Sequence, residues 1–259
     1  MAIKILDTES ELIRNGQPIV NHFEDKKVFI SGASRGIGRS IAELFVAEGA
    51  TVLGSTTSEK NDLVSIGVHQ SIVVDFSLRS DIERCAEFVR QHQPNIVINN
   101  AGINNPSPFE EIDHDEFLKI QLVNVFAPMA ICQAAIPGMR EKGWGRIINI
   151  ASAFSKVSKE HRAPYSASKF ALDGLTLALA IEHAAAGILA NCVSPGFIDT
   201  DMTRRILGDE GVRQMLKSVP IGRLAQPREI AQLVLWLSSS ENTYLTGQNI
   251  AIDGGFTRA

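Results

Sequence analysis

A tyrosine and a lysine four residues apart, Tyr165 and Lys169, are the side chains of this sequence best suited to proton transfer. Both fall near the start of a long helical pattern, and residues i and i+4 share one face of a helix, so the ammonium can lie against the phenol. A free phenol has a pKa of about 10, and a neighbouring cation lowers that pKa because it favours the phenolate. The pair therefore indicates a tuned acid or base, although any helix can carry a tyrosine and a lysine at this spacing.

A glycine-rich segment near the start of the chain indicates a bound cofactor. It runs Ser31-Gly32-Ala33-Ser34-Arg35-Gly36-Ile37-Gly38 and lies between a predicted strand and a predicted helix. Glycines in this place permit a tight turn and let backbone N–H groups approach a pyrophosphate at the start of the helix. The context predicts a dinucleotide site, with the alternative that the glycines only link a strand to a helix.

The end of the second predicted strand bears on which dinucleotide is bound. Enzymes selective for NAD carry an Asp or Glu about 20 residues after the glycines, where it holds the ribose 2′-hydroxyl. Here that place holds Ser55 or Thr56, and the glycine segment carries Arg35. Hydroxyls and a guanidinium can bind a 2′-phosphate, so we predict NADP(H). The alternative is that Arg35 is a solvated surface charge.

Short apolar segments rich in Val and Ile alternate with longer amphipathic ones along the chain. The short segments predict buried strands, and the longer ones predict helices between them. Such alternation implies right-handed crossovers and a parallel sheet covered on both faces. We therefore predict an α/β fold: an N-terminal extension over residues 1–25, then a single doubly wound Rossmann-type domain over residues 26–259, with a seven-stranded parallel sheet flanked by helices. The predicted strands are Lys27–Ser31, Ala50–Gly54, Ser71–Asp75, Asn95–Asn99, Gly145–Ala151, Ile188–Val193 and Gln248–Ile252, and the predicted helices are Ile37–Glu48, Ser80–His92, Glu116–Lys142, Tyr165–Ala186 and Pro227–Ser239.

Composition narrows the class of protein. The 259 residues are 44% hydrophobic and 21% charged, with a net charge of −4, which suits a globular protein and argues against a nucleic-acid partner. The most apolar segment, residues 170–193, is interrupted by charged residues, so no membrane span is predicted. The six histidines show no ligand spacing, so no metal is predicted. Three widely spaced cysteines predict reduced thiols in a cytoplasmic protein: Cys85, Cys132 and Cys192.

Taken together, the motifs resemble the short-chain dehydrogenase/reductase family in order and spacing, over about residues 26–256. Within the family the chain is most similar to bacterial 3-oxoacyl-acyl-carrier-protein reductases, through residues 32–38 and 195–200. The matching residues are Gly32, Gly36, Gly38, Asn99, Asn100, Ala101, Gly102, Asn124, Ser152, Tyr165, Lys169, Pro195 and Gly196.

The resemblance implies an NADP(H)-dependent enzyme that interconverts a ketone or 3-oxo group and a secondary alcohol. Tyr165 would protonate the carbonyl oxygen as hydride arrives, and Lys169 would lower the pKa of Tyr165 and bond the nicotinamide ribose. Ser152 would polarise the substrate oxygen, and Asn124 would position a water that links Lys169 to solvent. Elementary electrostatics agrees, because two hydroxyl donors stabilise the negative charge that hydride transfer builds on an oxygen.

The resemblance also implies which residues contact the cofactor. Asp75, at the end of the third strand, would meet the adenine, and Asn100 and Gly102 would border the adenosine. Ile198 and Thr200 would contact the nicotinamide amide. The full predicted set is Gly32, Ser34, Arg35, Gly36, Ile37, Gly38, Ser55, Asp75, Phe76, Asn100, Ala101, Gly102, Tyr165, Lys169, Pro195, Gly196, Ile198 and Thr200.

Three of these polar residues also have a purely local interpretation. Asp75 can cap a turn or helix, and Ser152 can serve a turn at the end of its strand. Asn124 can simply bond a backbone carbonyl. Both interpretations stay open for each residue.

Acyl-carrier-protein reductases present two arginines to their acidic carrier, and this sequence lacks both. Counted from Ser152 and Tyr165, the two positions fall on Gly143 and Ala186. Without these cations, docking of the carrier loses steering and charge pairing, although Arg140 is close in sequence. An acyl carrier protein is therefore one candidate partner, beside a small carbonyl or alcohol substrate.

The segment between Ser152 and Tyr165 departs from the family in being basic. In the family this loop borders the substrate, so its charge favours a carboxylated or phosphorylated small molecule, such as a sugar acid or a nucleotide sugar. The alternative is an ordinary solvated loop. The four predicted substrate-loop residues are Lys156, Lys159, His161 and Arg162.

Several alternatives concern the protein as a whole. The substrate is either a 3-oxoacyl thioester of fatty acid synthesis or a sugar acid or nucleotide sugar of surface polysaccharide synthesis. The alternative of another class is a non-catalytic dinucleotide-sensing regulator on the same fold. The resemblance further implies a homotetramer built on the helices over 116–142 and 165–186, and a mobile lid over 199–219.

Overall fold

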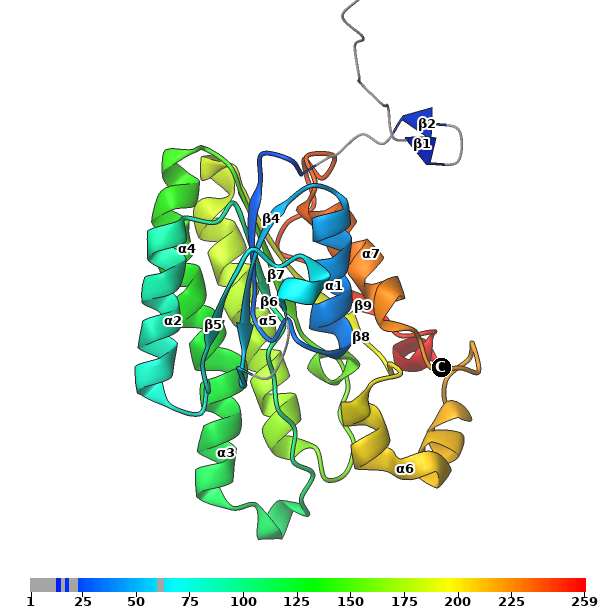
Figure 1. The fold of residues 1–259 in the computed structure, drawn as a ribbon. Helices are drawn as coiled ribbons and strands as arrows, with labels where there is room; N and C mark the ends of the chain where they lie inside the picture. The colour runs from blue at the N-terminus through cyan, green and yellow to red at the C-terminus, as the bar shows by residue number, and fades with distance from the viewer. Residues whose placement is uncertain (1–12, 15–16, 19–22, 60–62) are drawn as a thin grey trace, which may run out of the picture.

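Parallel strands form the central sheet of the computed structural model, which describes residues 13–14, 17–18, 23–59 and 63–259 (Figure 1). Within these residues the sheet has seven strands in the order β5-β4-β3-β6-β7-β8-β9. The chain adds strands outward from β3 to β5, crosses back to β6 and then adds strands on the other side, which is the doubly wound order. The strands are β3 Lys27–Ile30, β4 Thr51–Thr56, β5 Gln70–Val73, β6 Ile96–Asn99, β7 Gly145–Ile150, β8 Ile188–Pro195 and β9 Asn249–Ile252.

Helices cover both faces of the sheet, as Figure 1 shows. Helices α1 (Gly36–Ala47) and α7 (Pro227–Ser238) pack together on one face, and α2 (Arg79–His92), α4 (Ala127–Glu141) and α5 (Ala163–His183) cover the other. The other elements are the paired two-residue strands β1 Ile13–Arg14 and β2 Gln17–Pro18, helices α3 His114–Gln121 and α6 Asp201–Leu216, the π-helix η3 Leu122–Phe126, and the 3₁₀ turns η1 Val64–Ile66, η2 Phe109–Glu111, η4 Ala153–Ser155, η5 Ala184–Ala186 and η6 Phe256–Arg258. The predicted fold class is confirmed.

The central strands are buried on both faces, which explains their continuous apolar sequence. Every residue of β6, β7 and β8 is buried, and the side chains divide into one core under α1 and α7 and a second core under α2, α4 and α5. Phe23 belongs to the first core, where its ring meets the edge of Phe45 at a centroid distance of 5.0 Å. The predicted extension over 1–25 lies mostly outside the described residues, so its boundary stays a prediction.

A row of polar side chains crosses the second core. Asn99, Asn149 and Cys192 are register partners on β6, β7 and β8. Asn99 Nδ2 donates to Asn149 Oδ1 at 2.8 Å, and Asn149 Nδ2 donates to Thr176 Oγ1 of α5 at 2.7 Å. The Thr176 hydroxyl lies 3.1 Å from Cys192 Sγ. Hydrogen bonding makes these buried polar groups tolerable in an apolar core.

Two expected elements differ from the structure. The third predicted strand ends at Val73, so Asp75 follows the strand rather than ending it. The helix predicted over 116–142 divides into α3, the π-helix η3 and α4. The segment predicted as a lid contains α6, a helix interrupted by a kink where Gly208 takes a φ of 64°, and its role as a lid stays a prediction.

Among the described residues, one helical run, His114–Glu141, is long and apolar enough to cross a membrane by length and composition alone, and it differs from the apolar segment over 170–193 that the sequence analysis considered. About half of its most apolar stretch (56%) is buried in the protein, and α4 packs against α2 and the sheet. Its apolar residues therefore serve the core of the domain, as a core helix of this fold requires.

Candidate active site

The glycine-rich turn joins β3 to α1 and brings backbone groups together where side chains would not fit. Gly32 and Gly36 have φ values of 66° and 54°, a region that favours glycine. A methyl group on Gly38 would come within 2.2 Å of the Gly32 carbonyl oxygen and 2.5 Å of Asn100 Nδ2. The turn therefore exposes its backbone at the start of α1, which is the arrangement that binds a pyrophosphate.

Neighbouring polar side chains hold this turn from both sides. The Gly32 N–H donates to Ser55 Oγ at 3.1 Å, and Asn100 Nδ2 donates to the carbonyls of Ser31 and Gly32 at 3.0 and 3.1 Å. Ser31 Oγ in turn accepts from the N–H groups of Asn100 and Ala101 at 2.9 and 3.0 Å. The turn is thus fixed in shape by groups of the chain itself.

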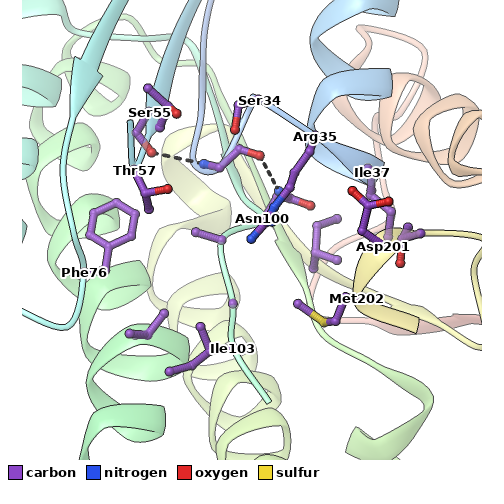
Figure 2. A pocket seen from close by; sticks show the side chains of 18 of the residues that line it. Ser34, Arg35, Ile37, Ser55, Thr57, Phe76, Asn100, Ile103, Asp201 and Met202 are labelled. Carbon is purple, nitrogen blue, oxygen red and sulfur yellow. Dashed lines mark hydrogen bonds between the residues drawn. The ribbon is translucent and has the colours of Figure 1, made fainter. Parts of the chain in front are cut away.

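A cavity opens beside the turn at the carboxyl ends of the strands, next to the point where the strand order reverses (Figure 2). Such a crevice is where dinucleotides bind in open α/β sheets. Among the predicted cofactor residues, the cavity is lined by Gly32, Ser34, Arg35, Gly36, Ile37, Ser55, Asp75, Phe76, Asn100, Ala101, Gly102, Lys169 and Thr200. It is also lined by Thr56, which the sequence analysis named beside Ser55, and by residues that the sequence did not single out: Thr57, Val74, Ile103, Val123, Ile150, Ala151, Asp201 and Met202.

The end of β4 differs in detail from the expectation. Ser55 lines the cavity, but it is 1% exposed and its hydroxyl already accepts the Gly32 N–H. Thr57, two residues further on, is exposed at the same cavity together with Arg35 (Figure 2). The free hydroxyl and the guanidinium at this end of the cavity therefore come from Thr57 and Arg35.

Tyr165 and Lys169 share one face of α5, as their spacing predicted. Lys169 Nζ lies 5.6 Å from the centroid of the Tyr165 ring and donates to the carbonyl of Ile150, at the end of β7, at 2.8 Å. Ser152 follows the same strand, and its hydroxyl interacts with the Tyr165 hydroxyl. It also accepts the N–H of Phe154 at 3.2 Å, so its capping role and its place at the site coexist.

The ionisation of this group departs from the expectation. Burial raises the pKa of Tyr165, whereas the Ser152 hydrogen bond and the charge of Arg162 act in the opposite direction. Burial also lowers the pKa of Lys169 to about 8. The expected net lowering of the Tyr165 pKa by Lys169 is therefore wrong, because a buried site disfavours both charged forms. The cation that opposes the shift is Arg162.

Asn124 lies in the π-helix η3 and uses its side-chain amide to join two parts of the site. Its Oδ1 accepts the Ile103 N–H and its Nδ2 donates to the Ile103 carbonyl, both at 2.9 Å. Nδ2 also donates to Ser168 Oγ of α5 at 3.0 Å. Asn124 thus fastens the loop after β6 to the helix that carries Tyr165, which matches its local interpretation, and π-helical turns often mark functional sites. Its expected water link stays a prediction.

Comparison with known proteins agrees with this geometry. A family model described as enoyl-(acyl carrier protein) reductase matches residues 32–257. The 3-oxoacyl-acyl-carrier-protein reductase FabG of Salmonella typhimurium is 38% identical over 239 residues, covering 90% of this chain and 98% of that protein. The FabG protein of Escherichia coli K12 is 37% identical over 240 residues, with the same coverage.

Solved structures give the same fold. A gluconate 5-dehydrogenase from Burkholderia cenocepacia, in complex with NADP and tartrate, has a TM-score of 0.85 at 27% identity and covers 93% of this chain and 98% of its own. A structure described as a short-chain dehydrogenase/reductase family protein has a TM-score of 0.86 at 30% identity, covering 92% and 100%.

The chain belongs to the short-chain dehydrogenase/reductase family. It is accordingly an oxidoreductase that uses a nicotinamide dinucleotide, so the expected family, enzyme class and nicotinamide cofactor are confirmed. The turn with its exposed backbone fits the pyrophosphate of such a cofactor.

Five residues that the family resemblance assigned to the cofactor do not line the cavity, and one of them is Tyr165. Ile198 is 4% exposed and packs in the core under α1 and α7. Gly196 donates its N–H to the Ile252 carbonyl at 3.0 Å, and a methyl group on it would come within 2.7 Å of Asp253 Cα. Pro195 is the last residue of β8. Gly38 lies in α1, where the Gly32 carbonyl is too close to leave room for a side chain. Asp75 lines the cavity, and its Oδ1 accepts the Ser77 N–H at 2.9 Å, which supports its local interpretation, while its contact with the adenine stays a prediction.

The four residues of the basic loop differ in how far they are buried. Lys156, Lys159 and His161 are exposed, whereas Arg162 is 8% exposed at the first position before α5. His161 takes a φ of 62°, and its carbonyl accepts the Ser107 N–H at 3.3 Å, which joins this loop to the loop after β6. Of the four predicted substrate-loop residues, one is therefore turned into the protein.

An aromatic cluster beside Tyr165 was missed by the sequence analysis. The Phe154 ring meets the rings of Tyr165, Phe197 and Phe256 edge-on, at centroid distances of 6.4, 6.2 and 6.3 Å. Phe197 and Phe256 meet each other at 5.0 Å. The three phenylalanines come from segments far apart in sequence, and no local pattern marks them. They give the site an apolar wall.

Proposed function

We propose that this enzyme interconverts a ketone and a secondary alcohol, with NADP(H) as its cofactor and Tyr165 as its acid and base. The observation that carries the proposal is the meeting of Tyr165, Ser152 and Lys169 at the carboxyl end of β7, beside the cavity. A bound cofactor would supply the hydride. The chain supplies a proton and the polar groups that stabilise a developing oxyanion.

The roles of the side chains follow from their surroundings. As hydride reaches the carbonyl carbon, the oxygen gains negative charge, which the Ser152 and Tyr165 hydroxyls stabilise by hydrogen bonding. Tyr165 then transfers its proton to that oxygen, and the ammonium of Lys169 stabilises the phenolate that remains. Burial raises the pKa of Tyr165, so the phenol holds its proton near neutral pH and is available as the acid.

NADP(H) rather than NAD(H) is supported by the end of β4. Ser55, Thr56 and Thr57 stand where NAD-selective enzymes place a carboxylate, and Arg35 faces the same cavity. The solved gluconate 5-dehydrogenase named above binds NADP, in agreement with this choice.

The test of the proposed reaction is Tyr165→Phe, which removes only the hydroxyl. We expect turnover with NADPH and a ketone to fall by about 10²–10⁴-fold, because general acid catalysis is lost. Binding of NADPH, followed by its fluorescence, should be retained. Full turnover in this variant would show that Tyr165 is not the proton donor.

A 3-oxoacyl thioester is the second candidate substrate, supported by the FabG relatives. Carrier docking has less support, since Gly143 and Ala186 provide no cation, and nearby Lys142 already donates to the Gln93 carbonyl at 2.8 Å. Assays of acetoacetyl-acyl-carrier-protein beside 5-keto-gluconate would decide between the two substrate classes.

We also propose a cytoplasmic homotetramer. Phe170, Leu177 and Ile181 are exposed at helical spacing along α5, an apolar stripe of the kind that a second copy covers. The three cysteines are buried free thiols, which is consistent with a reducing compartment. Light scattering on the purified enzyme and on Ile181→Arg, which should dissociate the assembly, tests the oligomeric state.

A further inference from the structure

Arg162 is a buried arginine whose charge has no partner among the described residues. Its side chain is 8% exposed, and its Nε and Nη1 atoms are buried with no hydrogen-bond partner. No carboxylate of the described residues forms an ion pair with it. Burying a cation and its donors without partners is unfavourable, so the group calls for an explanation, and a ligand that completes it is one.

The other buried arginine of the described residues, Arg146, provides a direct contrast. It is 4% exposed, but its Nη1 donates to the Gly145 and Gly187 carbonyls at 2.8 and 3.3 Å, and its Nη2 donates to the Asn242 carbonyl at 2.8 Å. Its guanidinium also lies 4.4 Å from the centroid of the Trp144 ring. Both Nη atoms of Arg146 are therefore bonded by the fold and only its Nε lacks a partner, whereas Arg162 lacks partners at both Nε and Nη1.

The position of Arg162 places its charge at the reacting end of the site. It stands three residues before Tyr165 at the start of α5, and its charge acts on the Tyr165 phenol. The loop that carries it is joined through the Ser107–His161 hydrogen bond to the loop after β6, where Asn104 has a buried Oδ1 that also lacks a partner. The unmet polar groups thus gather in the two loops that border Tyr165.

The rest of the surroundings limits the kind of ligand. Phe154 packs against the Tyr165 ring and, with Phe197 and Phe256, forms the apolar wall described above. The remaining cations of the basic loop are exposed. One buried guanidinium three residues before the reacting phenol suits a molecule with a carboxylate, because a guanidinium binds a carboxylate through two parallel hydrogen bonds.

We infer that Arg162 binds the carboxylate of the substrate, so that the enzyme acts on keto acids and hydroxy acids in preference to neutral ketones and thioesters. This inference rests on the proposed carbonyl–alcohol reaction at Tyr165. A site with a buried donor left unpaired discriminates strongly against a ligand that cannot complete it, whereas an apolar wall alone discriminates weakly.

The test compares matched acids and esters. Acetoacetate, levulinate and 5-keto-gluconate are each assayed beside their methyl esters with NADPH, using the wild-type enzyme, Arg162→Gln and Arg162→Lys. We expect the wild type to favour the acid of at least one pair by about 100-fold in kcat/KM, and Arg162→Gln to lose about 100-fold on that acid while its ester changes less than about threefold. Arg162→Lys should recover part of the loss, because it restores the charge but not the two-pronged geometry.

Two controls separate this inference from general damage. Arg228→Gln removes an exposed charge from α7 and should leave both kcat/KM values unchanged. The KM for NADPH should be the same in wild type and Arg162→Gln, because Arg162 does not line the cofactor cavity. An ester preferred in every pair, or an equal loss on acid and ester in Arg162→Gln, would overturn the inference and leave the proposed reaction standing.

If the enzyme reduces none of these compounds, a binding measurement still tests the inference. The melting temperature is followed with NADPH and each acid for wild type and Arg162→Gln. An acid that stabilises only the wild type supports carboxylate binding, and the absence of turnover then counts against the proposed reaction instead. If no acid distinguishes the two proteins, the role of Arg162 is refuted.

Discussion

The cofactor end and the substrate end of the cleft differ in how their polar groups are satisfied. Around the glycine turn, the amide of Asn100 and the hydroxyls of Ser31 and Ser55 are all bonded to backbone groups of the chain. At the substrate end, Arg162 and Asn104 carry buried polar atoms without partners. The first end is completed by the fold, whereas the second is completed only when a ligand with matching groups arrives.

This difference separates what the fold needs from what the reaction needs. A turn that is rigid before binding presents its backbone at little entropic cost, which suits a cofactor that every turnover shares. A site with unmet donors instead favours the one ligand that satisfies them. The substitutions below test this difference between the cofactor end and the substrate end of the cleft, in order of decreasing expected effect.

Gly38→Ala should have the largest effect, because it disrupts the glycine turn at the cofactor end of the cleft. The new methyl group would lie 2.2 Å from the Gly32 carbonyl oxygen, a backbone atom that cannot move without opening the turn. We expect the Kd for NADPH to rise by at least about 100-fold, as pyrophosphate binding depends on the close approach of the turn. Titration of NADPH fluorescence measures it, with the exposed change Glu43→Ala on the same helix as control. Unchanged affinity would mean that the turn is more compliant than its bonds indicate.

Arg146→Gln and Arg162→Gln should differ in stability, because the fold bonds both Nη atoms of Arg146, whereas Nε and Nη1 of Arg162 have no partner. Loss of the three carbonyl bonds of Arg146 should lower the free energy of unfolding by about 3 kcal/mol. Arg162→Gln should leave it unchanged or slightly raised, because an unpaired buried charge is removed. Urea unfolding of both variants gives the two values. Equal destabilisation would contradict the distinction between them.

Lys169→Met should reveal how much the free energy of unfolding is lowered by burying the Lys169 ammonium, which lies between the two ends of the cleft. Burial lowers the pKa of Lys169 from 10.5 to about 8, so the native state binds fewer protons than the unfolded state between these values. The penalty is fully present below pH 8 and is relieved as the pH rises toward 10.5. Between pH 7 and pH 10, wild type should therefore gain about 2 kcal/mol relative to Lys169→Met. Parallel pH dependences of the two proteins would show that the amine is not desolvated.

Arg35→Gln should have the smallest effect, because the side chain is exposed and solvent weakens its charge. We expect the KM for NADPH to rise by about tenfold and the KM for NADH to change little, since only the 2′-phosphate is affected. Initial-rate kinetics with the two cofactors provide the comparison. A similar change for both would place Arg35 away from the 2′-phosphate.

The sequence was most informative where a local pattern is also the physical cause. The apolar strands, the glycine turn and the Tyr165–Lys169 spacing each depend on residues close in the chain, and the fold places them as expected. The phenylalanine wall was missed because its members meet only in three dimensions. The pKa of Tyr165 was misjudged because burial, which a sequence does not reveal, outweighs the nearby charges.

The sequence alone could also not show which of the four basic loop residues is buried, because charge does not reveal which side chain turns inward. Arg162 immediately precedes α5, so the helix start fixes its backbone and turns it into the protein, while Lys156, Lys159 and His161 remain on the outer part of the loop. Ser55 shows the reverse case, since its hydroxyl looked available and is already used by the turn.

The row of Asn99, Asn149 and Cys192 across β6, β7 and β8 has a consequence for how the chain folds. In a sheet whose strands are all rich in Val and Ile, apolar packing alone distinguishes one alignment of neighbouring strands poorly from another. A slip by one residue would move each asparagine to the opposite face and leave its amide dehydrated and unbonded. The row thus favours one alignment of the sheet, because a misaligned sheet would bury unbonded amides when the helices close over it.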